Sequence, residues 1–147
     1  MAEIAATSVG AATACATQAA LDALVVPGRA TPCRVADDEL LLVCDPEVAA
    51  EIAREVETRL TALDPDAIVL ETTDAWAGSV IEGDDARAVF ALLSRLRLPA
   101  DGFVQGEVAH VPAKVLVEAD RIRIVVEAAL EDHLRSRVAI AAGERAT

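Results

Sequence analysis

The stretch from Asp66 to Pro99, DAIVLETTDAWAGSVIEGDDARAVFALLSRLRLP, decides the fold. Alternating β-branched and apolar residues at 66–71, and a second apolar run at 76–81, predict two strands. Gly83 and two carboxylates follow, where a helix would begin and its N-terminal N–H groups need acceptors. Apolar residues then recur at three- and four-residue steps, namely Ala86, Val89, Phe90, Leu93 and Leu96. They predict an amphipathic helix that Pro99 ends.

The rest of the chain supplies further strands and helices. Residues 31–45 predict a β-hairpin around Asp37-Asp38, and Pro46 opens a helix that ends at Asp64-Pro65. One apolar stripe marks that helix: Val48, Ile52, Val56, Leu60 and Leu63. Strands are expected at 103–111, 113–118 and 121–127, with one face of the last buried, and a helix at 129–141. Gly106 within the first of these strands marks a bulge or a close backbone approach.

The resulting order, ββαββαβββα, predicts an α+β protein with a mostly antiparallel sheet and helices packed on it. Its ferredoxin-like (split βαβ) units occur singly or as a duplicated pair. We expect residues 1–30 to form an N-terminal arm or a short helix, residues 31–142 a single α+β domain, and residues 143–147 a loose C-terminal tail.

The composition excludes several classes of function. A net charge of −12 repels phosphate backbones, so nucleic acid is not an expected partner. No apolar run approaches the ~20 residues of a membrane span. The three cysteines show no CxxC pair and no metal-ligand spacing, and the N-terminus lacks the charges of a secretory signal, so we expect a cytoplasmic protein.

Two cysteines of the hairpin allow two interpretations. With Asp37-Asp38 at the tip, Cys33 lies opposite Leu42, and Cys44 is a diagonal neighbour of Cys33 on the same face. That placement permits a disulfide. The commoner alternative is a pair of small buried residues, because free cysteine is among the most buried residue types.

Chemistry-bearing motifs are scarce. The sequence shows no phosphate-binding glycine loop and no HExxH, and we assign neither a catalytic residue nor a metal ligand. The candidate interface or ligand residues are Trp76, Phe103, His110 and Asp74. Trp76 fits either core packing or an interface, because tryptophan is enriched at binding hot spots. His110, near an expected loop, fits either a structural role or a ligand contact.

Several segments resemble one known family in their arrangement. They are Asp74 to Trp76, the strand from Val80 to Gly83, the helix around Val89, and the Phe-x-x-Gly of Phe103 to Gly106. This arrangement resembles the gamma subunit of heterotetrameric sarcosine oxidase and the related folate-binding fold of aminomethyltransferase, the glycine-cleavage T-protein. The strand and helix between Glu39 and Leu63 fit the same fold. The Asp–Trp spacing is one residue tighter than in that family.

The resemblance implies a small, non-catalytic accessory subunit that docks onto larger flavin-containing partners of amine oxidation or one-carbon metabolism. No cofactor is expected on this chain alone; flavin or folate would belong to the partner complex. Full aminomethyltransferases are longer, and their catalytic aspartate matches no residue here. Two alternatives remain: a homo-oligomeric ferredoxin-like module that binds small molecules or regulates, and a small enzyme that uses His110 and Asp74.

Overall fold

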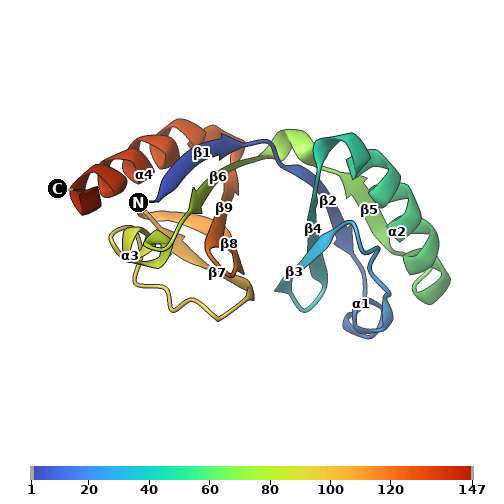
Figure 1. Cartoon of the computed structure of the whole chain (residues 1–147). Helices are drawn as coiled ribbons and strands as arrows, with labels where there is room; N and C mark the ends of the chain where they lie inside the picture. The colour runs from blue at the N-terminus through green and yellow to red at the C-terminus, as the bar shows by residue number, and fades with distance from the viewer. Residues whose placement is uncertain (1, 147) are drawn as a thin grey trace. The chain divides into compact units, whose positions relative to one another are not determined.

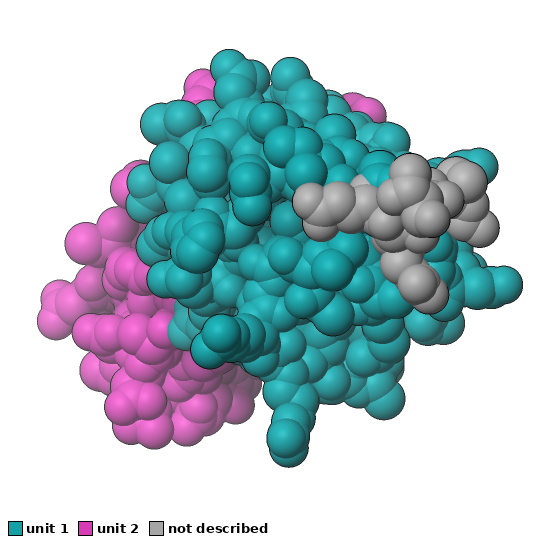
Figure 2. All heavy atoms as spheres, turned by 90° about the vertical axis from the view of Figure 1, so that its left-hand side faces the viewer, with its two compact units in different colours: residues 1–8, 75–147 teal, residues 9–74 magenta. Residues whose placement is uncertain are grey.

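A computed structural model gives the backbone of residues 2–146 and the side chains of residues 2–143. The chain forms two compact units: unit 1 comprises residues 1–8 and 75–147, and unit 2 comprises residues 9–74 (Figure 2). Each unit is an antiparallel sheet with helices on one face. The fold class is therefore α+β, as the sequence predicts.

Unit 2 is a four-stranded sheet in the order β3-β4-β2-β5 (Figure 1). Its elements are β2 (Gly10–Cys15), α1 (Gln18–Ala23), β3 (Thr31–Ala36), β4 (Glu39–Cys44), the 3-10 turn η1 (Pro46–Val48), α2 (Ala49–Leu63) and β5 (Ile68–Glu71). Helix α1 joins two strands that flank β4, and α2 joins two strands that flank β2. Two such split βαβ connections make unit 2 ferredoxin-like.

Helices α1 and α2 cover one face of this sheet. Ile52, Val56 and Leu60 of the predicted stripe are fully buried, and they share a core with Leu40 and Leu42 of β4. The stripe fades at its ends: Val48 is half-buried, and Leu63 is 47% exposed. The periodicity therefore identified the buried side of α2, which holds the helix on the sheet.

The β3–β4 hairpin has a different register from the predicted one. Cys33 lies opposite Leu41 rather than Leu42, because the strand is irregular between Arg34 and Ala36. A shift of one residue turns a side chain to the other face of the sheet. Cys33 and Cys44 therefore lie on opposite faces, and the predicted shared face is wrong. Both thiols are buried, which confirms the alternative of two small buried residues.

Unit 1 is a five-stranded sheet in the order β1-β6-β9-β8-β7 (Figure 1). Its elements are β1 (Glu3–Thr7), β6 (Trp76–Glu82), α3 (Ala86–Ala91), β7 (Gly102–Val108), β8 (Val111–Glu118), β9 (Arg121–Glu127), the 3-10 turn η3 (Ala128–Leu130) and α4 (Glu131–Ala146). Ile122, Ile124 and Val126 of β9 are buried together with residues of α3 and α4. The predicted buried face of this strand is confirmed.

The stretch that decides the fold joins the two units. Its first strand, β5, belongs to unit 2, and its second strand, β6, belongs to unit 1. Between them lies the 3-10 turn η2 (Thr73–Ala75). The predicted order ββαββαβββα matches β3 to α4, whereas the structure divides residues 31–142 between two units at Asp74.

The two ends of the chain differ from the expected boundaries. Residues 3–23 form β1, β2 and α1 instead of an arm or a single short helix. Strand β2 lies inside its sheet, between β4 and β5. Pairing with these two neighbours stabilises a strand conformation that its alanines alone do not favour. Helix α4 continues past Gly143 to Ala146, where a loose tail was expected; Thr147 lies outside the described residues. Within the described chain, no helix combines the length and apolarity of a membrane span.

Candidate functional site

The four candidate residues are distributed over both units. Asp74 is exposed in η2 at the end of unit 2, whereas Trp76, Phe103 and His110 belong to unit 1. In the unit 1 sheet, Trp76 is on β6 and Phe103 is on the edge strand β7, with β9 and β8 between them. His110 is in the turn between β7 and β8.

Trp76 and Phe103 do share one face of the sheet. Phe103 pairs with Leu116, and this row continues through Arg123 to Val80, which is on the same face of β6 as Trp76. Helices α3 and α4 pack on the opposite face. The ammonium of Lys114 lies 5.7 Å from the centre of the Trp76 ring, within the range of a cation–π contact. The Trp76 Nε1 atom is buried and has no hydrogen-bond partner among the described residues.

His110 is at the tip of a strained hairpin. Ala109 and His110 both have positive φ, 51° and 70°, as a two-residue turn of the primed type requires. Neither is a glycine, so the surrounding contacts must hold the turn. The Ala109 N–H donates to the Leu93 carbonyl at 2.8 Å, and His133 Nε2 lies 2.8 Å from the Ala109 carbonyl oxygen. The His110 side chain is 86% exposed, and its Nδ1 is 3.7 Å from Glu107 Oε1.

Hydrogen bonds of Ser94 explain why α3 is short. The sequence predicts a helix through Leu96, but α3 ends at Ala91. The Ser94 hydroxyl donates to the Glu107 carbonyl at 2.6 Å and accepts from the Leu96 N–H at 3.0 Å. These bonds hold residues 94–98 as an irregular segment beside β7. Serine side chains can compete with a helix in this way, because they form hydrogen bonds with nearby backbone groups.

A close approach to Gly106 completes this packing. A β-carbon on Gly106 would lie 2.9 Å from Leu96 Cδ1, so the absence of a side chain lets Leu96 sit on the strand. Leu96 and Leu98 pack against the unit 1 core, while Arg95 and Arg97 are exposed. The sequence predicted a bulge or a close approach at Gly106, and the close approach is confirmed.

Together these residues frame a depression, which we call the α3 hollow. Its volume is about 530 Å³, and its lining includes Leu92, Ser94, Arg95, Leu96, Glu107 and His110. Leu92 is 50% exposed, so the hollow offers an apolar wall as well as charged groups. Of the four candidate interface or ligand residues, only His110 is among the residues that line the α3 hollow.

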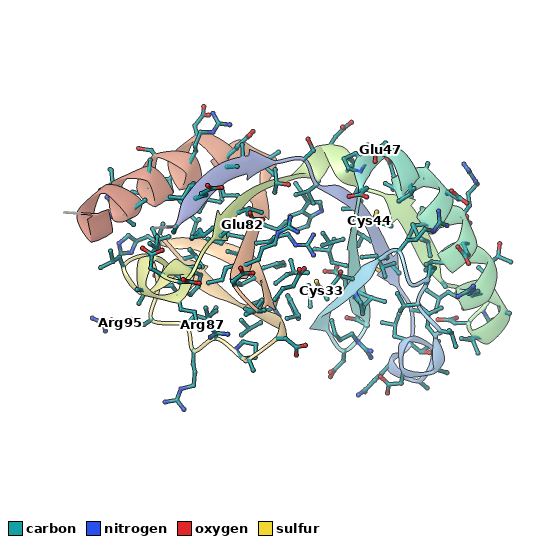
Figure 3. The ribbon with its side chains drawn as sticks, in the orientation of Figure 1. Cys33, Cys44, Glu47, Glu82, Arg87 and Arg95 are labelled. Carbon is teal, nitrogen blue, oxygen red and sulfur yellow. The ribbon has the colours of Figure 1, made fainter. Side chains whose placement is uncertain are left out.

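The charge around the α3 hollow differs from that of the whole protein. Residues 86–100, which we call the arginine segment, contain three arginines and no aspartate or glutamate, although the net charge is −12. Arg87 donates to the carbonyls of Pro99 and Ala100 at 2.7 and 3.2 Å. Arg87 and Arg95 both lie at the α3 end of unit 1 (Figure 3). The alternation of arginine and leucine at 95–98 is the sequence signal that could have identified this surface.

Other chemistry-bearing groups are isolated. In the described part of the chain, no three His, Cys, Asp or Glu side chains gather as metal ligands would. Burial raises the pKa of the Cys44 thiol, with Asp45 adding to the effect. The Arg29 guanidinium donates to Glu51 at 3.1 Å and lowers the pKa of that carboxyl.

Comparison with known proteins identifies the fold. No model of a known protein family and no curated protein matches this sequence. A chain of heterotetrameric sarcosine oxidase from Corynebacterium sp. U-96, in complex with pyrrole 2-carboxylate, matches with a TM-score of 0.81 and 15% identity. The match covers 97% of this chain and 84% of that chain.

Two further structures support the same architecture. Glycine cleavage system aminomethyltransferase T from Bartonella henselae matches with a TM-score of 0.66 and 16% identity, covering 93% of this chain but only 45% of that one. The ligand-free regulatory subunit of aspartate kinase from Thermus thermophilus matches at 0.55 and 12% identity, covering 95% and 97%. The predicted resemblance to the sarcosine oxidase subunit and T-protein fold is thus confirmed as a likeness of fold.

Proposed function

We propose that this chain is a small, non-catalytic subunit of a hetero-oligomeric enzyme of amine oxidation or one-carbon metabolism. In this proposal it docks onto larger partner chains that hold the flavin or folate, and it binds no cofactor by itself. Its contribution is to assemble the complex and to shape an interface within it.

One observation carries the proposal. The match to a chain of a heterotetrameric sarcosine oxidase covers 97% of this chain and 84% of that chain. At 15% identity this likeness concerns the fold, so the activity is our proposal.

Exposed apolar side chains favour a role in assembly. Ile68 and Leu70 are each 60% exposed on β5, which is an edge strand of its sheet. Leu92 in unit 1 is 50% exposed. Edge strands and exposed apolar groups are surfaces that proteins commonly cover with a partner.

Purification of the tagged protein from its source organism at low salt tests the proposal. We expect larger chains to accompany it, the mixture to show flavin absorbance, and oxygen consumption to begin when sarcosine is added. The isolated chain, prepared by recombinant expression, should show neither flavin absorbance nor oxygen consumption with sarcosine. A wild-type protein that elutes without larger chains under these conditions would overturn the proposal.

A second candidate is a homo-oligomeric module that binds a small molecule or regulates an enzyme. The ferredoxin-like topology of unit 2 and the end-to-end match to a regulatory subunit of aspartate kinase favour it. It predicts a stable dimer or larger homo-oligomer, and a rise in melting temperature with one member of a metabolite panel.

A further inference from the structure

The α3 hollow and the arginine segment combine three properties of a docking surface. The first is an apolar wall, with Leu92 half-exposed beside a depression of about 530 Å³. The second is positive charge, supplied by Arg95 in the lining and by the exposed Arg97 two residues further along the chain. The third is a firm frame, because Ser94 and Ala109 tie the loop after α3 to the β7–β8 hairpin through bonds of 2.6 and 2.8 Å.

These two arginines are available for a partner. Within residues 2–143, neither Arg95 nor Arg97 makes a hydrogen bond or an ion pair, and both side chains are exposed. By contrast, six arginines elsewhere are paired with carboxylates, namely Arg29, Arg34, Arg59, Arg121, Arg123 and Arg135. Six of the chain's 13 lysines and arginines are thus neutralised locally. Within residues 2–143, Arg95 and Arg97 form no ion pair, and neither do Arg54 on α2 and Arg137 on α4.

We infer that the α3 hollow and the arginine segment bind an acidic segment of the larger partner chain. One apolar side chain of that segment would enter the hollow against Leu92 and Leu96, and its flanking carboxylates would meet Arg95 and Arg97. Glu107, which also lines the hollow, would repel these carboxylates and so favour their approach to the arginines. This inference rests on the proposed function and names the chemistry of the partner.

Charge complementarity is the reason to choose an acidic occupant. A net charge of −12 repels acidic surfaces, and two unpaired arginines only two residues apart give such a surface a place to approach. Guanidinium groups also bind carboxylates in a bidentate geometry, which adds orientation to attraction. Binding through these arginines should therefore weaken as the salt concentration rises.

Zero-length carbodiimide crosslinking of the purified complex tests the inference. The chain has only one lysine, Lys114, so a lysine introduced elsewhere gives a readily assigned crosslink to a carboxylate. We expect the variant R95K/R97K to couple to Asp or Glu of a larger partner chain. The matched control is R54K/R137K, which places lysines at two exposed positions on α2 and α4 without changing the net charge. This control should give no such crosslink.

A second pair of variants measures the dependence of assembly on charge. R95E/R97E should reduce the amount of partner recovered at low salt about tenfold or more, whereas R54E/R137E, with the same change in net charge, should not. Unchanged circular dichroism would show that both variants fold.

The outcomes separate the inference from the proposed function. If the wild-type complex forms but partner crosslinks arise at residues 54 and 137 or at Lys114 instead, the docking surface is wrong and the subunit role stands. If residues 95 and 97 crosslink only to a second copy of this chain, the larger partner is wrong. If no larger chain accompanies the wild type, the proposed function fails and this inference fails with it.

Discussion

Leu96 and Gly106 are in direct contact in unit 1, with Leu96 Cδ1 2.9 Å from the position that a β-carbon on Gly106 would take. This contact holds the irregular segment after α3 on the edge strand β7. The α3 hollow depends on it, because Leu96 forms part of its wall.

Gly106→Val should therefore destabilise the protein by roughly 1–3 kcal/mol, since the added methyl groups must displace Leu96. Urea denaturation measures this loss. The double variant L96A/G106V should lose less than the sum of the two single variants, because the residues are in contact. Additive losses would contradict the contact.

Gly10 lies still closer to its neighbours. A β-carbon there would be 2.6 Å from the Asp45 carbonyl oxygen and 2.8 Å from Pro46 Cα, both backbone atoms at the start of η1. Gly10→Ala should lower the free energy of unfolding by about 3 kcal/mol, because backbone atoms move less easily than side-chain tips.

Gly28→Ala is the matched control, because no heavy atom lies within 4 Å of its β-carbon position. It should be neutral or slightly stabilising, by up to about 1 kcal/mol, through the loss of unfolded-state entropy. Equal effects of the two substitutions in urea denaturation would show that the strand β2 does not pack against η1 as described.

The turn at His110 offers a substitution that should not destabilise. His110 has a φ of 70°, a conformation that costs an L-residue roughly 1–2 kcal/mol and that glycine adopts freely. His110→Gly should leave the free energy of unfolding unchanged or raise it by up to about 1 kcal/mol. Ala139→Gly, at an exposed position in α4, should instead cost about 1 kcal/mol. A large loss in H110G would contradict the turn geometry.

The cysteines should differ in reactivity. Cys15 is exposed, whereas Cys33 and Cys44 are buried, so iodoacetamide should modify the folded protein at Cys15 first. Partial burial, together with Glu39 and Asp38, raises the pKa of the Cys15 thiol. A raised pKa leaves less thiolate at neutral pH, so its rate of modification should keep rising above the usual thiol pKa. Peptide mass spectrometry across a pH series checks both points, and earlier modification of Cys44 would contradict them.

Much of the fold could be predicted from the sequence because local signals and packing agree. The apolar spacing of Ile52, Val56 and Leu60 in α2, and the alternation of Ile122 and Ile124 in β9, each identify a buried face. These residues face the core of their own unit, so burial reinforces the local preference.

The remaining features depend on contacts between distant segments. Strand β2 consists largely of alanine, a weak strand former, and its place between β4 and β5 decides its conformation. An irregularity after Arg34 turned Cys33 to the other face. The sequence predicts separate strands at 103–111 and 113–118, with a break at Pro112. In the structure Pro112 lies near the start of β8, where it pairs with Glu107 before the pairing with β9 begins at Lys114.

The sequence indicates little about the α3 hollow, although the candidate residue His110 is part of its lining. Trp76 and Phe103 are candidates from the sequence, and they lie on one face of the unit 1 sheet with two strands between them. The α3 hollow arises from the early end of α3, which Ser94 and the Leu93 carbonyl bring about by bonding to the β7–β8 hairpin. Such bonds join segments that are distant in the sequence, so the local residue pattern does not predict them.

The mass of the native assembly tests the central claim most directly. Native mass spectrometry of the tagged wild-type protein, purified from its source organism at low salt, gives that mass without dissociating the subunits. We expect a mass that includes at least one larger chain and is not an integer multiple of the mass of the tagged chain, which is 15.3 kDa plus the tag. A monomer, or a homo-oligomer at an integer multiple of this mass, would contradict the subunit role.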